Sequence, residues 1–211
     1  MQNMARAPTQ IVGDGHLARQ LAQMLGLIVG QDVFLRSLFF RQGAESITDP
    51  LQEQILDAIK LGPTYFAIGY ADPRSKLQLL DFLTHSGVKL MSYKSITPCT
   101  WDAQIGQGCI LMGGIFLGVD VSVGDATYIG ANAVISEGVS IGRGSYISPG
   151  AVVCGGVVIG EGVFIGAGSI IANDIEIGSL CKINAGSCVT RSMPSGQTWL
   201  ERRVHLSIME T

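Results

Sequence analysis

The sequence predicts two structural units: an α/β unit with a small Rossmann-like parallel sheet over residues 1–95, and an all-β left-handed parallel β-helix over residues 96–192. Two observations support this division. The first half alternates short apolar segments with amphipathic segments of helical period, which is typical of βαβ units. In the second half an aliphatic residue recurs at every sixth position, the signature of a left-handed β-helix. Residues 193–211 are expected to form a C-terminal tail.

Strands of the N-terminal unit are expected at residues 9–12, 33–35, 65–68 and 89–92. A helix follows the turn Gly13–His16, and two more begin at Asp49-Pro50 and Asp72-Pro73, where aspartate suits the N-cap and proline the first turn. Residues 37–48 receive no assignment. Because parallel sheets bind ligands at the carboxyl ends of their strands, a site is expected at residues 13–16, 36–37 and 69–72.

The periodic half contains an unbroken series of aliphatic positions six residues apart. Three hexads make one triangular coil, so fifteen hexads predict five coils, and residues 18 apart are expected to lie above one another. The series consists of Ile105, Leu111, Leu117, Val123, Ile129, Ile135, Ile141, Ile147, Val153, Ile159, Ile165, Ile171, Ile177, Ile183 and Val189.

The third residue after each aliphatic is mostly glycine, asparagine or aspartate, which tolerate the positive φ that a sharp corner needs. Each hexad is therefore predicted to be one short strand and one corner. The predicted corners include Gly108, Gly114, Asp120, Asn132, Gly138, Gly144, Gly150, Gly156, Gly162, Gly168 and Asp174.

Composition excludes several functions. The net charge is −3 without a basic tract, which argues against nucleic acid. No apolar run reaches the length of a membrane span, and no signal peptide is recognisable. Five cysteines without a CxxC motif favour reduced thiols in the cytoplasm, with Cys109 and Cys181 at packing positions. No histidine lies between His85 and His205, so a histidine-held metal on the coils is not expected.

The Gly13-Asp14-Gly15-His16 turn leaves two interpretations open. The glycines could allow a tight strand-to-helix turn, or the turn could present free N–H groups to a phosphate at the helix N-terminus. His16 could contact the ligand or cap the helix. The third glycine of a dinucleotide fingerprint is absent, because the run continues as His-Leu-Ala.

Acyl transfer from a thioester suits such a prism. A groove aligns the thioester with its acceptor, corner N–H groups stabilise the oxyanion, and a base deprotonates the acceptor.

The whole chain resembles the bacterial sugar O- and N-acyltransferases, typified by the sialic-acid O-acetyltransferases and the bacillosamine-pathway N-acetyltransferases. The resemblance rests on the GxG-His turn, the Ala67-Ile68-Gly69 strand end before an arginine-containing helix, a linker near Ser95–Pro98 and the uninterrupted hexads. It implies a homotrimer with active sites between adjacent prisms, acetyl-CoA as co-substrate, and a nucleotide-linked sugar or amino sugar as acceptor.

The resemblance also assigns roles to residues. The nucleotide loop of the family falls on Asp14, Gly15 and His16, and its strand-end glycine on Gly69. An acidic pair that binds uridine in the family falls on Arg36 and Ser37, so uridine recognition is in question. The positions that contact the cofactor fall on Tyr146, Ala167 and Ala185, of which the last two are 18 apart.

The catalytic histidine of the family is replaced by Glu137, and the acidic residue after it by Gly138. A carboxylate is a weak base for a hydroxyl unless a dry site favours its protonated form, and it serves an amine acceptor better. The alternative is that Glu137 is a solvated corner residue. Three functions remain: a nucleotide-sugar acyltransferase, a catalytically silent or regulatory binding relative, and an acyltransferase for a different small acceptor.

Overall fold

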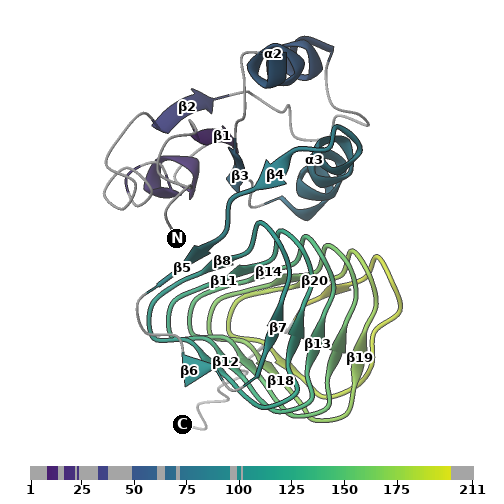
Figure 1. Cartoon of the computed structure of the whole chain (residues 1–211). Helices are drawn as coiled ribbons and strands as arrows, with labels where there is room; N and C mark the ends of the chain where they lie inside the picture. Colours follow the sequence, from purple (N-terminus) through teal and green to yellow (C-terminus); the bar gives the residue numbers. More distant parts are fainter. Residues whose placement is uncertain are drawn as a thin grey trace, which may run out of the picture.

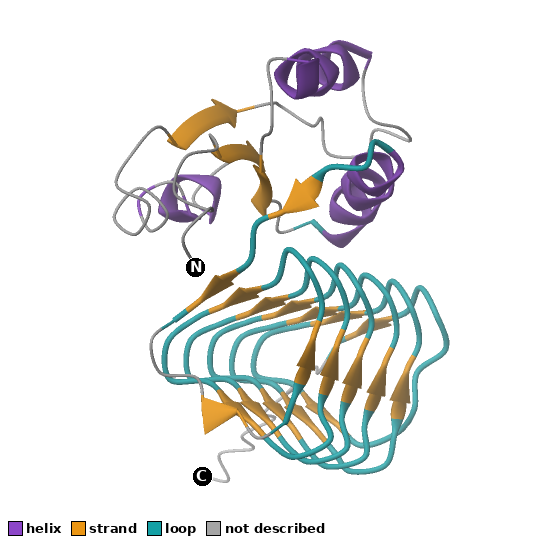
Figure 2. Ribbon diagram, in the orientation of Figure 1, coloured by secondary structure: helices purple, strands orange, loops and turns teal. Residues whose placement is uncertain are grey.

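The computed structural model describes residues 9–13, 17–21, 23, 33–37, 49–60, 65–69, 72–95, 99–100 and 102–200. An N-terminal α/β unit stands on one face of a three-sided β-solenoid (Figure 1). Coloured by secondary structure, helices occur only in the N-terminal unit among the described residues, and the solenoid alternates short strands with turns (Figure 2).

Four parallel strands form the N-terminal sheet, in the order β2-β1-β3-β4. The expected strands are present within one or two residues of their predicted bounds. The strands are β1 (Thr9–Gly13), β2 (Val33–Ser37), β3 (Tyr65–Gly69) and β4 (Lys89–Leu90), and the helices are α2 (Asp49–Lys60) and α3 (Pro73–His85). Residues 17–21 are also helical, as predicted after the first turn.

The start of α3 confirms the capping expected from the sequence. Asp72 is the N-cap, its side chain accepts a hydrogen bond from the backbone N–H of Ser75 at 2.9 Å, and Pro73 opens the helix. One face of α3 is apolar and buried, with Leu79 and Leu83 packed in the same cluster as Phe66 of β3. This packing fixes α3 to the sheet.

The solenoid has three parallel sheets, built from strands of two residues each. The five-stranded sheet contains β7 (Gln104–Ile105), β10 (Ser122–Val123), β13 (Ser140–Ile141), β16 (Val158–Ile159) and β19 (Glu176–Ile177). The seven-stranded sheet contains β5 (Tyr93–Lys94), β8 (Ile110–Leu111), β11 (Tyr128–Ile129), β14 (Tyr146–Ile147), β17 (Phe164–Ile165), β20 (Lys182–Ile183) and β22 (Thr198–Trp199). The six-stranded sheet contains β6 (Cys99–Thr100), β9 (Phe116–Leu117), β12 (Val134–Ile135), β15 (Val152–Val153), β18 (Ile170–Ile171) and β21 (Cys188–Val189).

These strands make about six coils, which corrects the five predicted from the hexads and fits a left-handed β-helix. The sheets run past residues 96–192 at both ends, because β5 pairs with β8 and β22 pairs with β20. The residues of the added strands that align with the aliphatic series are not aliphatic themselves. Lys94 aligns with Leu111, Thr100 with Leu117 and Trp199 with Ile183, so a count of aliphatic residues misses them.

The predicted aliphatic series forms the core of the prism. All of its members except Ile105, which is partly buried, are buried, and members 18 apart in the sequence align in neighbouring strands. Every predicted corner residue also has a positive φ, between 56° and 73°. Two further corners that the pattern did not include, Ala126 and Leu180, have φ of 54° and 60°.

Polar residues inside one edge have a structural task. Side chains of Cys109, Thr127 and Ser145 donate hydrogen bonds to the carbonyl oxygens of Gly124, Gly142 and Gly160 on the next coil, at 3.2, 3.3 and 3.0 Å. Cys181 donates to Pro194 in the same way. Burial raises the pKa of the Cys109 thiol to about 11, so this cysteine is a packing residue, as its position predicts.

The prism has three edges, each between two of its sheets. The docking edge joins the five- and seven-stranded sheets and carries Gly108, Ala126, Gly144, Gly162 and Leu180. The alanine edge joins the seven- and six-stranded sheets and carries Ala167 and Ala185 beside Gly150, Gly168 and Gly186. The glutamate edge joins the six- and five-stranded sheets and carries Glu137, with Asp120, Gly138, Gly156 and Asp174.

Candidate functional site

The carboxyl ends of three neighbouring strands in the N-terminal sheet lie level with one another. Gly13 at the end of β1 aligns with Ser37 of β2 on one side and with Gly69 of β3 on the other. Arg36 aligns with Val12, one residue before this edge. Asp14, Gly15 and His16, predicted to bind the nucleotide, lie outside the described residues. The candidate acceptor positions 36–37 and 69 thus share one edge of the sheet.

Gly69 has a packing reason to be glycine. A Cβ built on Gly69 would lie 2.9 Å from the Cα of Ala18, in the helical residues 17–21. Ala18 is itself buried. The helix after the first strand therefore packs directly against the end of β3, which holds this edge of the sheet in a fixed shape.

Tyr146 lies on the seven-stranded sheet beneath the N-terminal unit. Its ring stacks between Tyr128 and Phe164, with centroid distances of 4.3 and 5.3 Å. The ammonium nitrogen of Lys76, from α3, lies 5.3 Å from the centroid of the Tyr146 ring. Lys76 is only 1% exposed, and burial lowers its pKa to about 7. Tyr146 is thus part of the junction between the two units.

Ala167 and Ala185 occupy the alanine edge on successive coils, as their spacing predicts. The N–H of Gly186 donates to the carbonyl of Ala167 at 2.8 Å, and both alanines are exposed. Gly166 must be glycine here, because a Cβ would overlap the backbone of Ala185. The two alanines form a narrow exposed strip, and Tyr146 lies away from it on the sheet that α3 covers.

Glu137 is exposed on the glutamate edge. Its carboxylate lies over the next coil, since a Cβ built on Gly155 would be 2.8 Å from the Glu137 Oε1 atom. The backbone carbonyl of Glu137 accepts a hydrogen bond from the N–H of Gly156 at 3.0 Å. The six-stranded sheet separates this carboxylate from the strip of Ala167 and Ala185.

The outer face of the six-stranded sheet is apolar. Its outward residues include Phe116, Val134, Val152 and Ile170, which align along the sheet. Phe116 is 39% exposed and Ile170 is 45% exposed. Within one chain, the candidate base and the candidate cofactor strip therefore flank an apolar face from opposite sides.

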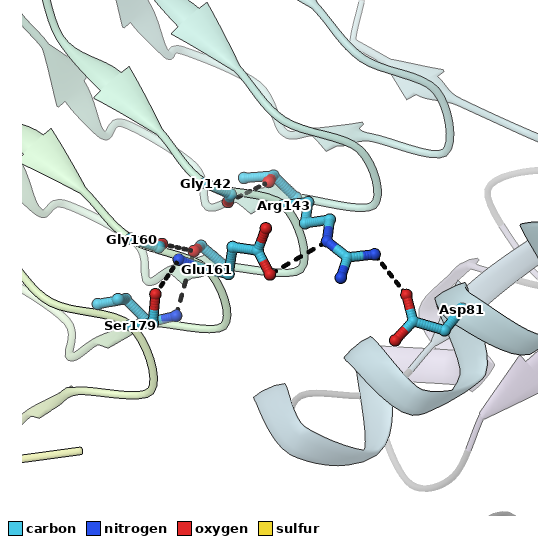
Figure 3. A network of polar contacts seen from close by, with 9 residues as sticks. Asp81, Gly142, Arg143, Gly160, Glu161 and Ser179 are labelled. Carbon is cyan, nitrogen blue, oxygen red and sulfur yellow. Dashed lines mark hydrogen bonds and ion pairs between the residues drawn. The ribbon is translucent and has the colours of Figure 1, made fainter. Parts of the chain in front are cut away.

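The structure also reveals a polar network that the sequence reasoning missed. Arg143 on the docking edge forms an ion pair with Asp81 of α3, and its Nε atom lies 3.1 Å from the Glu161 Oε2 atom (Figure 3). These hydrogen bonds raise the pKa of Arg143. Arg143 and Glu161 also line a groove of about 600 Å³, together with Asp125 and with residues of the five-stranded sheet such as Ser140. The signal was present, because positions 125, 143 and 161, which are 18 apart, carry Asp, Arg and Glu.

No group of histidine, cysteine, aspartate and glutamate side chains that could hold a metal occurs among the described residues. The described helices include none with the length and apolar character needed to span a bilayer.

Comparisons with known proteins agree with the repeat. Residues 120–155 and 156–191 match the family model described as bacterial transferase hexapeptide (six repeats). No curated protein sequence matches the chain significantly.

Solved structures match over both units. The acetyltransferase domain of PglB from Neisseria gonorrhoeae FA1090 is 22% identical with a TM-score of 0.75, and the match covers 92% of this chain and 96% of that one. PerB from Caulobacter crescentus, in complex with CoA and GDP-perosamine, is 20% identical with a TM-score of 0.76, covering 92% and 93%. WeeI from Acinetobacter baumannii AYE is 17% identical with a TM-score of 0.61, covering 91% and 95%.

The resemblance predicted from the sequence is therefore confirmed: the chain has the fold of sugar acetyltransferases with a hexapeptide β-helix. At these identities the likeness shows the fold, and the chemistry of this chain depends on its own residues.

Proposed function

We propose that this protein is an acyltransferase that moves an acetyl or similar acyl group from acyl-CoA to a nucleotide-linked sugar or amino sugar, in the biosynthesis of a surface polysaccharide or glycan. The observation that carries the proposal is the match over more than nine-tenths of the chain to PerB, whose structure holds both CoA and GDP-perosamine. The match includes the N-terminal sheet as well as the prism. An acceptor site on the Rossmann-like sheet and a donor site on the prism are then parts of one enzyme.

The proposal includes a homotrimer, because the candidate site is divided within one chain. The apolar face that includes Phe116 and Ile170 suits burial against other copies. A cyclic trimer packed through this face would bring Glu137 of one copy near Ala167 and Ala185 of the next. Acetyl-CoA would then lie along the alanine strip, with the nucleotide sugar held at Asp14, Gly15, His16, Arg36, Ser37 and Gly69. Analytical ultracentrifugation tests the trimer, and Ile170→Glu is expected to give monomers.

Glu137 is assigned as the base, which suits an amino-sugar acceptor. The amine nitrogen attacks the thioester carbonyl, the C–N bond forms as the C–S bond breaks, and CoA leaves as its thiol. Glu137 takes the proton that the nitrogen loses and then gives it to the departing sulfur, so the carboxylate is regenerated. Corner N–H groups would steady the oxyanion of the tetrahedral intermediate. Tyr146, which the resemblance assigns to the cofactor, would support the donor side from the seven-stranded sheet, where Lys76 of α3 lies over its ring. No step requires a metal or a nucleic acid. Among the described residues Cys109, Cys154, Cys181 and Cys188 form no disulfide, which suits the proposed cytoplasmic location.

A thiol-release assay tests this function. The protein is incubated with acetyl-CoA and a panel of UDP-, GDP- and dTDP-linked amino sugars, beside an active relative. Release of CoA with at least one acceptor is expected, together with its loss in Glu137→Gln. If no acceptor releases thiol while the relative is active, the proposal is wrong.

A second candidate is a silent or regulatory binding relative, which the replacement of the family histidine by Glu137 favours. Calorimetry separates the two, since this candidate binds CoA or nucleotide sugar without turnover, and Glu137→His would restore activity. A third candidate, transfer to a different small acceptor, is favoured by Arg36 and Ser37 at the acidic pair. Tight binding of a UDP-sugar would exclude this third candidate.

A further inference from the structure

Helix α3 places a leucine side chain into a notch on the docking edge. A Cβ built on Gly144 would lie 2.6 Å from Leu77 Cδ2, and one built on Gly162 would lie 2.7 Å from Leu77 Cδ1. Gly144 and Gly162 are corners of successive coils, with φ of 68° and 60°. The notch therefore consists of space that two glycines leave open and that Leu77 fills.

A charged clamp lies directly beside the notch. Asp81, one turn beyond Leu77 on α3, pairs with Arg143, the residue before Gly144 (Figure 3). Arg143 also bonds Glu161, the residue before Gly162, with a distance of 3.1 Å between Nε and Oε2. The clamp thus joins α3 to the same two coils that form the notch. On the other side of Leu77, the buried Lys76 lies over the Tyr146 ring.

A large residue, Leu180, lies at the end of the notch on the docking edge. Leu180, the corner after Gly162, adopts a φ of 60° although it is a leucine. Its Cδ2 atom would lie 3.0 Å from a Cβ on Gly162. The described corners with positive φ on the other two edges are all glycine, asparagine or aspartate, whereas those on the docking edge are glycine, alanine or leucine. The apolar corners of the docking edge are therefore suited to contact with the apolar side chain of Leu77 from α3.

We propose that the notch and the clamp set the distance between the acceptor edge of the N-terminal sheet and the prism, so that Leu77 and Arg143 are positioning residues for acyl transfer. Helix α3 begins four residues after Gly69, so a shift of α3 shifts this edge. The kinetic part of the inference rests on the proposed function, whereas the seating of α3 is a property of the fold. Displacement by about 1 Å can lower a rate by about 100-fold, because transfer depends on proximity.

The decisive variant is Gly144→Leu, which fills the notch. Leu180 shows that this edge accepts leucine at the same backbone conformation. Its matched control is Gly196→Leu, because Gly196 has a φ of 77° and no described atom lies within 4 Å of its Cβ position. The N–H of Gly196 donates a hydrogen bond to the carbonyl of Ser179, just as the N–H of Leu180 donates to the carbonyl of Glu161 one coil earlier. Gly196 therefore lies on the same edge.

Hydrogen–deuterium exchange of α3, CoA affinity and turnover of the accepted nucleotide amino sugar are measured for each variant. In Gly144→Leu we expect faster exchange in α3, a fall in kcat of about 100-fold and unchanged CoA affinity. Gly196→Leu should match the wild type in all three. Adding Leu77→Ala to Gly144→Leu should restore kcat by about tenfold or more, because the new leucine then occupies the vacated space.

Three results would overturn the inference. If hydrogen–deuterium exchange of α3 is unchanged in Gly144→Leu, Leu77 in the notch does not hold α3 on the prism. Displaced α3 with wild-type kcat would refute the positioning role, and so would a parallel loss of kcat and CoA affinity, which indicates general unfolding. If the wild type acylates no acceptor, the proposed function fails and the positioning role with it. The exchange data still decide whether Leu77 in the notch holds α3 on the prism.

Discussion

The docking edge and the alanine edge share one backbone but follow different side-chain rules. Corners on both have φ near 65°, yet at Gly150 and Gly168 on the alanine edge no described atom lies within 4 Å of the Cβ position. On the docking edge, Gly108 and Gly144 face Leu90 and Leu77 of the N-terminal unit. At Gly150 and Gly168 glycine therefore serves backbone conformation alone, whereas at Gly108 and Gly144 it serves both conformation and packing. The choice of residue at a corner thus depends on what the corner contacts.

The largest expected effect tests what the two edges share. In Gly142→Ala, on the docking edge, the new Cβ would overlap the backbone of Gly160, and in Gly166→Ala, on the alanine edge, that of Ala185. Each change should lower the free energy of unfolding by about 3 kcal/mol, because a neighbouring coil must move. Urea unfolding measures the loss. A large loss at one edge only would contradict a common backbone rule.

The second prediction concerns the buried lysine of the junction. Burial lowers the pKa of Lys76 to about 7 from 10.5, although Cys109 and Asp72 nearby act to raise it. Above pH 7 the unfolded state holds a proton that the folded state has lost, so the free energy of unfolding rises with pH. The rise is at most about 1.4 kcal/mol per pH unit.

The useful window is pH 7 to 9. Above it, the raised pKa values of Cys109, Tyr128 and Tyr146 mean that the folded state holds protons the unfolded state loses, which lowers stability as the pH rises further. Urea unfolding of Lys76→Met should lose the rise between pH 7 and 9. The matched control is Lys182→Met, since Lys182 lies over the Phe164 ring on the same sheet but is exposed. A slope that persists in Lys76→Met would exclude Lys76 as its cause.

The third prediction separates conformation from packing. Gly150→Ala should cost about 1 kcal/mol, the strain of a Cβ at positive φ with open space around it. Gly108→Ala carries the same strain, and its Cβ would also lie 3.0 Å from the Cβ of Leu90, so its thermal unfolding should begin at a lower temperature than that of Gly150→Ala. Equal melting temperatures would show that Leu90 does not press on this corner.

The smallest expected effect is that of the clamp on stability. Arg143, Asp81 and Glu161 have side chains that are 37%, 48% and 50% exposed, so solvent screens their attraction. Arg143→Gln should therefore lower the free energy of unfolding by less than about 1 kcal/mol, and 1 M salt should shrink the difference. The control Lys60→Gln removes the exposed pair with Asp57 and should have almost no effect. A loss that does not respond to salt would argue against an electrostatic clamp.

Much of the fold was predictable because it depends on local rules. The hexads predicted the core of the prism. The positions of glycine, asparagine and aspartate predicted its corners, and Asp72-Pro73 predicted the start of α3. The extra coil was missed because Lys94, Thr100 and Trp199 pair through their backbones without an aliphatic residue.

The contacts between the units were not predictable in the same way. Nothing in the repeat says that Leu77 meets Gly144, because that contact joins elements 67 residues apart whose meeting depends on the orientation of α3. Ala126 and Leu180 broke the corner pattern, and the structure supplies the reason for this difference, since both pack on the docking edge. The roles of Glu137, Ala167 and Ala185 stay predictions that rest on resemblance.

Complementation between two inactive variants tests the central claim most directly. Glu137→Gln removes the base from the glutamate edge and Ala185→Trp blocks the alanine edge, and co-expression places both in mixed assemblies. If the active site lies between two copies of a cyclic trimer, about a quarter of the interfaces join two intact edges, so about a quarter of the wild-type transfer rate should return. Mixed trimers without any recovered transfer would contradict the account.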